Sequence, residues 1–168
     1  MKLRWLFLQI IMINVFMGLG QIKENAYRLM LSALLEHNVQ EISVDSLHSN
    51  FDTFTLLDAR SLEERKVSFI SGSKYVGYKD FKLESVNDID KDSPIVVYCS
   101  VGYRSEKIAQ QLNEAGFKDV ANLYGGIFEW VNKAYDLSNN EGECNDIHGF
   151  SWTWSKWIDS RDGLKVVY

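Results

Sequence analysis

The chain has 168 residues, enough for one domain with a hydrophobic core and an additional segment. Hydrophobic residues make up 46% and charged residues 24%, with a single proline, so long disordered tracts are not expected. The 18 basic and 23 acidic residues give a net charge of −5, which does not fit a nucleic-acid-binding protein. Long-range attraction of anions is not expected either, so any selectivity for an anion has to be local.

The first 20 residues have the pattern of a secretory signal peptide. Lys2 and Arg4 give a basic start, an apolar run follows from residue 6, and Gly18 and Gly20 are small residues at a cleavage point near Gly20. The alternative is an uncleaved membrane anchor, but the apolar run is shorter than the roughly 20 residues of a spanning helix. We therefore expect an exported protein, periplasmic or secreted, with no stable membrane span after residues 1–20 are removed.

Apolar runs and helical periodicity alternate along the rest of the chain. Strands are predicted at residues 41–44, 54–57, 74–76, 94–98 and 120–123. Helices are predicted at residues 22–37, 45–49, 61–66, 81–89, 105–115 and 127–135, the second of them capped by Asp45. This alternation is typical of a three-layer α/β fold, in which helices flank a mostly parallel central sheet of about five strands.

The chain divides into a helical lead-in at residues 21–40, a main domain at residues 41–136 and a tryptophan-rich extension at residues 137–168. Residues 137–146 are polar and predict a loop that leads out of the main domain. A helix that begins near Ser151 would place Trp154 and Trp157 on one side. We favour a helix that folds back and buries its tryptophans over an exposed surface for a partner.

Cys99 is the first candidate for a reactive residue, since it follows the apolar strand 94–98 and precedes the helix predicted from Ser105. Ligands of parallel sheets bind beyond the carboxyl ends of the strands, and Asp58 also follows such an end. The N-terminus of a helix offers N–H groups and a positive dipole end, which lower the pKa of a thiol. The sequence therefore predicts a Cys99 thiolate that holds anionic sulfur or oxygen species against backbone amides.

Cys144 is the other cysteine, and in an oxidising compartment two cysteines commonly form a disulfide. We favour a reactive Cys99 over a structural Cys99–Cys144 disulfide. A redox-labile bridge, or a resolving role for Cys144, is a further hypothesis. The two cysteines and three histidines lack the spacing of metal ligands, and the sequence has no phosphate-binding glycine loop, so no metal or cofactor is expected.

Three motifs occur in order between residues 41 and 133. The first is Asp58-Ala-Arg60, followed by Glu63-Glu64 and by residues 68–73. The second is Tyr98-Cys-Ser-Val-Gly-Tyr-Arg-Ser105, and the third is Leu123-Tyr-Gly-Gly126 with Trp130. Together they resemble the single-domain rhodanese-like (thiosulfate sulfurtransferase) family. Ser68-Phe69 stands where that family has Gly-His, and Ser71-Gly72-Ser73 where it has Pro-Gly-Ala; we interpret both differences as structural drift.

The resemblance implies a sulfurtransferase that carries a sulfane sulfur as a persulfide on Cys99. It implies a small sulfur-donor anion such as thiosulfate, and an acceptor that is a thiol, cyanide or a protein, in a ping-pong reaction. The residues expected to bind the substrate are those of the loop, Ser100, Val101, Gly102, Tyr103, Arg104 and Ser105. Asp58 and Arg60 are expected as an internal ion pair that supports the site rather than as catalysts.

The role of Arg104 has two interpretations, since it either meets the sulfonate of the donor or pairs with a carboxylate. Ser105 is expected to cap the helix and to donate a hydrogen bond to the sulfur. The alternative function is a non-enzymatic rhodanese-like binding or sulfur-carrier module. A phosphatase or arsenate reductase-like activity ranks third, because those related enzymes use seven residues from the cysteine to the arginine, whereas the segment from Cys99 to Arg104 has six.

Overall fold

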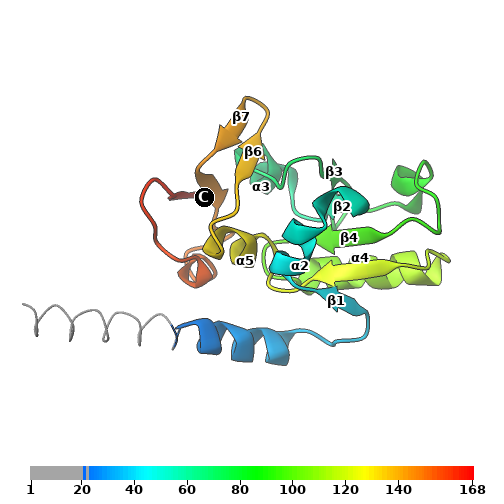
Figure 1. Ribbon diagram of the computed structural model, residues 1–168, viewed down its shortest axis with the longest axis horizontal. Coiled ribbons are helices and arrows are strands. Elements are labelled where there is room, and N and C mark those ends of the chain that lie inside the picture. Colours follow the sequence, from blue (N-terminus) through cyan, green and yellow to red (C-terminus); the bar gives the residue numbers. More distant parts are fainter. Residues whose placement is uncertain (1–20, 22) are drawn as a thin grey trace, which may run out of the picture. The chain divides into compact units, whose positions relative to one another are not determined.

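The computed structural model describes residue 21 and residues 23–168, and it divides into two units, residues 1–34 and residues 35–168 (Figure 1). The first unit contains the lead-in helix, which ends at residue 34 rather than at the predicted residue 37. His37 has a positive φ of 54°, a conformation that no helix can continue. The predicted signal segment, residues 1–20, lies outside the described residues. None of the helices in the described part of the chain is long and apolar enough to cross a membrane.

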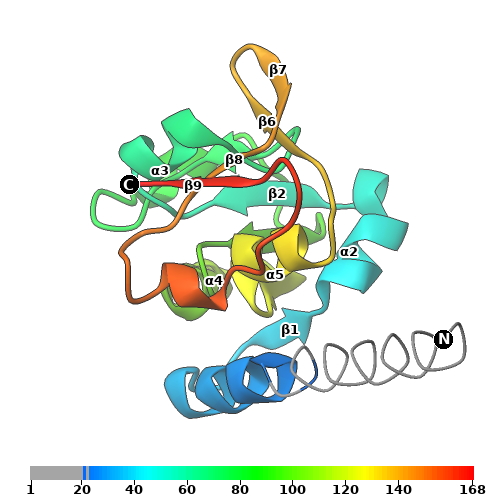
Figure 2. The same cartoon turned by 90° about the vertical axis from the view of Figure 1, so that its left-hand side faces the viewer.

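The second unit is built on a five-stranded parallel sheet with the strand order β1-β5-β4-β2-β3 (Figures 1 and 2). Its strands are β1 (Gln40–Ile42), β2 (Thr55–Asp58), β3 (Lys74–Tyr75), β4 (Ile95–Tyr98) and β5 (Val120–Leu123). The predicted α/β class, with a central sheet of about five strands, is therefore confirmed.

Helices cover both faces of this sheet and form the two outer layers of a three-layer fold. They are α2 (Val44–Ser49), α3 (Leu62–Val67), α4 (Tyr103–Glu114) and α5 (Gly126–Asn132). Leu57 and Val97 belong to one hydrophobic cluster with Ile108 of α4. Leu56 and Val96, which point to the opposite face, are also buried. Strands that are covered on both faces consist of continuous apolar residues, which explains why β4 is the clearest strand in the sequence.

Two predicted helices are wrong in detail. The hydroxyl of Ser43 accepts the N–H of Ser46 at 3.1 Å, so Ser43 is the N-cap of α2 and Asp45 lies in its first turn. Because α2 already begins at Val44, β1 ends at Ile42 instead of residue 44. Residues 81–89 contain only the short 3₁₀ helix η2 (Leu83–Val86).

The loop predicted for residues 137–146 is wrong, because this segment forms an antiparallel hairpin of β6 (Leu137–Asn139) and β7 (Gly142–Cys144). Leu137 is buried, and the backbones of Ser138 and Phe69 exchange two hydrogen bonds of 2.7 and 2.9 Å. The polar residues of the hairpin hide this pairing, since it depends on backbone groups and one buried leucine.

The helix predicted from Ser151 is also wrong, because β8 (Asp146–His148) pairs with β9 (Lys165–Val167) in parallel, and only the 3₁₀ helix η3 (Ser155–Trp157) lies between them. Figure 2 shows these two strands side by side next to α3. The extension buries Ile147 and Ile158, whereas the side chain of Trp152 is 70% exposed. The extension therefore folds back, but not as a helix that buries its tryptophans.

Candidate active site

The site lies where β2 and β4 end at the same edge of the sheet. The register pairs Asp58, the last residue of β2, with Tyr98, the last residue of β4. Cys99 follows Tyr98 directly and opens the loop that leads into α4. Because parallel strands end at a common edge, this register places Cys99 and the residues that follow Asp58 beside each other.

The Cys99 sulfur is a hydrogen-bond acceptor inside the loop. The side chain is 1% exposed, and the N–H of Gly102 donates to Sγ at 3.2 Å. Burial alone would raise the pKa of the thiol, but the charge of Arg104 and hydrogen bonds from Ser105 and Gly102 outweigh it and lower the pKa below its ordinary value. The loop therefore favours the thiolate, which is the nucleophilic form of cysteine.

The N-terminus of α5 binds two backbone carbonyl groups of this loop. The N–H of Ile127 donates to the carbonyl of Cys99 at 2.9 Å, and the N–H of Phe128 donates to that of Ser100 at 3.1 Å. In a trans peptide the N–H points opposite to the C=O, so the next N–H groups of the loop point away from α5. A Cβ on Gly126 would lie 2.4 Å from the Cys99 carbonyl oxygen, so the close approach requires glycine.

The helix α4 begins two residues earlier than predicted. Gly102 is its N-cap with a φ of 113°, a conformation that glycine adopts without strain. Ser105 therefore lies inside the first turn and is not the cap. Its hydroxyl contacts the carbonyl oxygen of Gly102 at 3.1 Å and Oδ1 of Asn122 on β5 at 2.7 Å, which ties the loop to the neighbouring strand.

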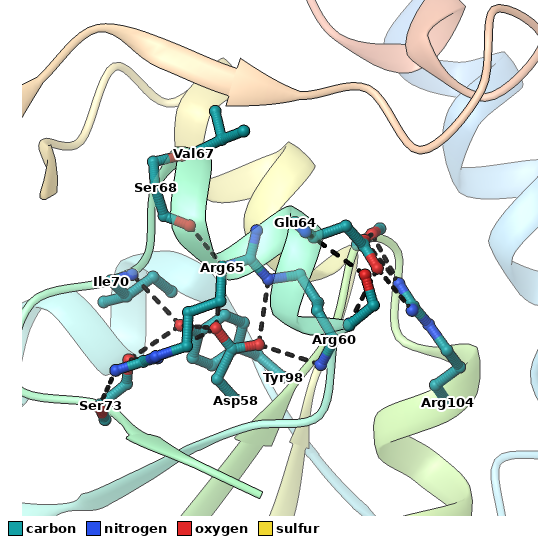
Figure 3. A network of polar contacts seen from close by, with 12 residues as sticks. Asp58, Arg60, Glu64, Arg65, Val67, Ser68, Ile70, Ser73, Tyr98 and Arg104 are labelled. Atoms are coloured by element: carbon teal, nitrogen blue, oxygen red, sulfur yellow. Dashed lines mark hydrogen bonds and ion pairs between the residues drawn. The ribbon is translucent and has the colours of Figure 1, made fainter. Parts of the chain in front are cut away.

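Arg104 pairs with a carboxylate, which is one of the two interpretations drawn from the sequence. Its Nη1 and Nη2 donate to the two carboxylate oxygens of Glu64 at 2.7 and 2.8 Å (Figure 3). The hydroxyl of Ser100 donates to Glu64 at 2.6 Å, and Nη2 of Arg104 also donates to that hydroxyl oxygen at 2.9 Å. The two-pronged geometry orients the guanidinium along the edge of the loop.

Glu64 reaches this position because of its place in α3. Ser61 is the N-cap and accepts the N–H of Glu64, while the Glu64 carboxylate accepts the N–H of Ser61 at 3.0 Å, so the two form a capping box. Burial alone would raise the pKa of Glu64, but its hydrogen bonds with Arg104, the charge of Arg104 and the Ser100 hydroxyl lower it to about 2. Glu64 is therefore ionised at neutral pH.

A second network surrounds Asp58 (Figure 3). Its carboxylate accepts hydrogen bonds from Nε and Nη2 of Arg60 at 3.0 and 2.8 Å, from Nη1 of Arg65 at 3.1 Å and from the hydroxyl of Tyr98 at 3.0 Å. Burial would raise the pKa of Asp58, but the Arg60 charge and these hydrogen bonds outweigh it and hold the pKa below its usual value. Asp58 and Arg60 form the internal ion pair that the sequence analysis expects.

The structure brings the predicted loop residues 99–105 together and adds residues that the sequence analysis did not assign to the site. These are Glu64, Arg65, Tyr98 and Asn122. Only Glu64 has a local signal, because a serine followed three residues later by a glutamate is the pattern of a capping box. Its pairing with Arg104 joins two elements that are distant in sequence, which such a pattern does not reveal.

The two cysteines are free thiols in this structure. Cys144 lies at the end of β7, where its Sγ contacts the carbonyl oxygen of Val67 at 3.9 Å. Burial raises the pKa of the Cys144 thiol. Within residue 21 and residues 23–168, no cluster of three or more His, Cys, Asp or Glu side chains could hold a metal ion.

Fold and site together define an α/β protein with a buried cysteine, whose thiol pKa is lowered, in a loop between a parallel strand and a helix. The chain matches the family of the Rhodanese-like domain over residues 43–133, more than half of its length. It therefore belongs to the rhodanese-like family.

Individual relatives support this assignment over parts of their length. The chain is 27% identical over 99 residues to "Putative sulfur carrier protein YrkF" of Bacillus subtilis, covering 57% of this chain and 53% of that protein. It is 49% identical over 50 residues to the thiosulfate sulfurtransferase GlpE of Coxiella burnetii, covering 29% of this chain and 47% of that protein. The match thus spans about half the length of these two relatives.

Solved structures agree with the fold. A rhodanese-related protein from Thermoplasma volcanium superposes with a TM-score of 0.54 at 23% identity, covering 58% of this chain and 96% of that chain. At this identity the likeness supports the fold alone.

Proposed function

We propose that the protein is a sulfurtransferase in which Cys99 carries a sulfane sulfur as a persulfide. The observation that carries this proposal is the environment of the Cys99 sulfur. Burial alone would raise the pKa of the thiol, but the charge of Arg104 and hydrogen bonds, among them that from the Gly102 N–H, outweigh burial and lower it. Membership of the rhodanese-like family and the similarity to a thiosulfate sulfurtransferase support it.

The reaction consists of two displacements at sulfur. The Cys99 thiolate attacks the outer sulfur of thiosulfate, the bond between the two sulfurs of the donor breaks, and sulfite leaves with the electron pair of that bond. In the second step an acceptor thiolate or cyanide attacks the terminal sulfur of the persulfide, and the Cys99 thiolate leaves. This is covalent catalysis with a ping-pong sequence.

The protein contributes stabilisation of negative charge. The N–H of Gly102 points at the Cys99 sulfur, and α5 holds the carbonyl groups on the opposite side of the loop. Backbone donors fixed in this way stabilise charge that develops on sulfur during the transfer, without reorganisation at the moment of reaction.

A sulfur-carrier module is the second candidate, and the similarity to the Bacillus subtilis protein favours it. Both functions use a Cys99 persulfide. They differ in the second step, because a carrier delivers its sulfur to a protein partner, whereas a sulfurtransferase turns over repeatedly with a small acceptor.

The test is the intact mass of the purified, reduced protein after incubation with thiosulfate, for the natural chain and for Cys99→Ser and Cys144→Ser. We expect a gain of about one sulfur atom that cyanide removes in the natural chain and in Cys144→Ser, and none in Cys99→Ser. Repeated formation of thiocyanate would favour the enzyme over the carrier. A reduced Cys99 that gains no sulfur from any donor would contradict both.

A further inference from the structure

The extension that follows the family domain contributes a side chain to the Cys99 site. The ring centroid of Phe150 lies 5.0 Å from Cζ of Arg104, the distance of a cation–π contact. Phe150 is outside residues 43–133, the segment that matches the family. The contact is therefore a feature of this chain's extension.

The backbone of Phe150 adopts an uncommon conformation. Its φ is +62°, in the left-handed region that disfavours residues with a bulky side chain. The N–H of Phe150 donates to Nδ1 of His148 at 3.0 Å, and β8 anchors this turn through pairing with β9. A strained residue that is held by its surroundings is a candidate for a functional position.

With Phe150 in place, Arg104 is engaged on two sides. Its Nη1 and Nη2 atoms bind Glu64 and Ser100, and the ring of Phe150 covers the guanidinium face. The Arg104 side chain is only 16% exposed. The positive charge acts on Cys99, but the Glu64 carboxylate neutralises it and the Phe150 ring covers one face, so less of it is left for the sulfonate of an incoming donor.

Exposed aromatic side chains lie beside Arg104, and the nearby Lys107, whose Nζ is 6.0 Å from the ring centroid of Tyr103, pairs with Glu36. Phe150 is 47% exposed, and Tyr103, the residue before Arg104, is 40% exposed. Arg60 and Arg65, the arginines of the neighbouring network, both pair with Asp58. Phe150 and Tyr103 thus offer aromatic faces beside Arg104, which suit an organic group better than the thiosulfate dianion.

We propose that Phe150 is a specificity-determining residue that favours an organic persulfide over thiosulfate as the sulfur donor of Cys99. This inference rests on the proposed sulfurtransferase function. The Cys99 thiolate attacks the outer sulfur of R–S–SH, the S–S bond breaks, and the leaving thiolate takes the proton of the outer sulfur to give R–SH. Cys99 becomes the persulfide anion, so atoms and charge balance.

The experiment measures single-turnover sulfur loading of the reduced full chain from benzyl persulfide and from thiosulfate, by quenching and intact mass. The variant is Phe150→Ala, and Phe150→Tyr retains the ring. Trp152→Ala is the matched control, because it removes a 70% exposed aromatic residue of the same extension whose ring contacts Lys156 instead of Arg104. The readout is the ratio of the two loading rates, since the donors differ in intrinsic reactivity.

We expect Phe150→Ala to shift this ratio about two- to fivefold toward thiosulfate, because it removes an aromatic face offered to the organic group and uncovers the guanidinium of Arg104. Phe150→Tyr and Trp152→Ala should keep the ratio of the natural chain. Loading from both donors with an unchanged ratio in Phe150→Ala, or an equal shift in Trp152→Ala, would overturn this inference and leave the sulfurtransferase proposal intact. Absence of loading from either donor would instead contradict the sulfurtransferase proposal.

Discussion

The two carboxylate–arginine networks at the edge of the sheet have the same chemistry and different positions (Figure 3). Asp58 and Arg60 are both fully buried and connect the ends of β2 and β4 through Tyr98. Glu64 and Arg104 join α3 to the Cys99 loop, and the Arg104 charge lowers the pKa of Cys99. The buried Asp58–Arg60 pair thus links the ends of the strands, whereas the Glu64–Arg104 pair determines how much positive charge lies next to the Cys99 thiol.

The strongest test of this comparison is Asp58→Asn. The substitution leaves the buried Arg60 charge without its partner, so we expect the free energy of unfolding to fall by about 3–5 kcal/mol. Asp88→Asn is the control, because Asp88 pairs with Lys74 at an exposed position, where solvent screening leaves an ion pair little effect on stability. Denaturant titration measures both. Equal, small losses would show that the Asp58 network does not stabilise the fold.

Gly126→Ala tests how much the backbone contact between α5 and the Cys99 loop contributes to stability, without changing either ion pair. An added Cβ would lie 2.4 Å from the Cys99 carbonyl oxygen, and φ is +57°. We expect a loss of about 2–4 kcal/mol, together with slower sulfur loading, from strain and overpacking. Gly72→Ala has a similar φ of +72° with nothing within 4 Å, so it measures the backbone strain alone. Similar losses in the two variants would argue against a close fit between α5 and the loop.

Glu64→Gln and Arg104→Gln test the electrostatic role of the second network. Removal of the Glu64 charge leaves Arg104 less neutralised, so the pH midpoint of Cys99 alkylation should fall. Removal of Arg104 should instead raise this midpoint. Measurement of alkylation rate against pH gives the midpoints. General damage to the loop would move both midpoints in the same direction.

The stability of Glu64→Gln should depend on pH. We expect it to cost about 1–3 kcal/mol at neutral pH through the lost charged hydrogen bonds. Since the pKa of Glu64 in the folded protein is about 2, below its ordinary 4.5, the ion pair stabilises the fold above pH 4.5. The difference from the natural chain should shrink as pH falls below 4.5 and vanish as pH passes through about 2. A difference that is constant down to pH 2 would contradict a charged Glu64.

The features that the sequence predicts correctly depend on local patterns. The apolar residues of β4, the glycine of the Cys99 loop and the amphipathic helix after it are visible within a short window. Their order along the chain is enough to indicate a parallel α/β sheet with a thiol at its carboxyl edge.

The features that the sequence does not reveal depend on distant contacts. Glu64 and Arg104 come from different helices, and the hairpin of β6 and β7 attaches through backbone bonds between Ser138 and Phe69. Ser43 and Asp45 are both good N-cap residues, and only the turn after β1 decides between them. Phe150 reaches Arg104 because β8 and β9 pair, and two strands of three residues each leave too short a pattern to suggest this pairing.

The backbone bonds from α5 to the Cys99 loop also make the geometry of the loop depend on residues that are synthesised after it. Cys99 leaves the ribosome before Ile127 and Phe128, whose N–H groups hold the carbonyl side of the loop. The groups that lower the pKa of the thiol, Arg104, Ser105 and Gly102, lie on the segment that begins with this loop. Because domains fold as units, we expect the full reactivity of Cys99 only after the chain has been made through α5.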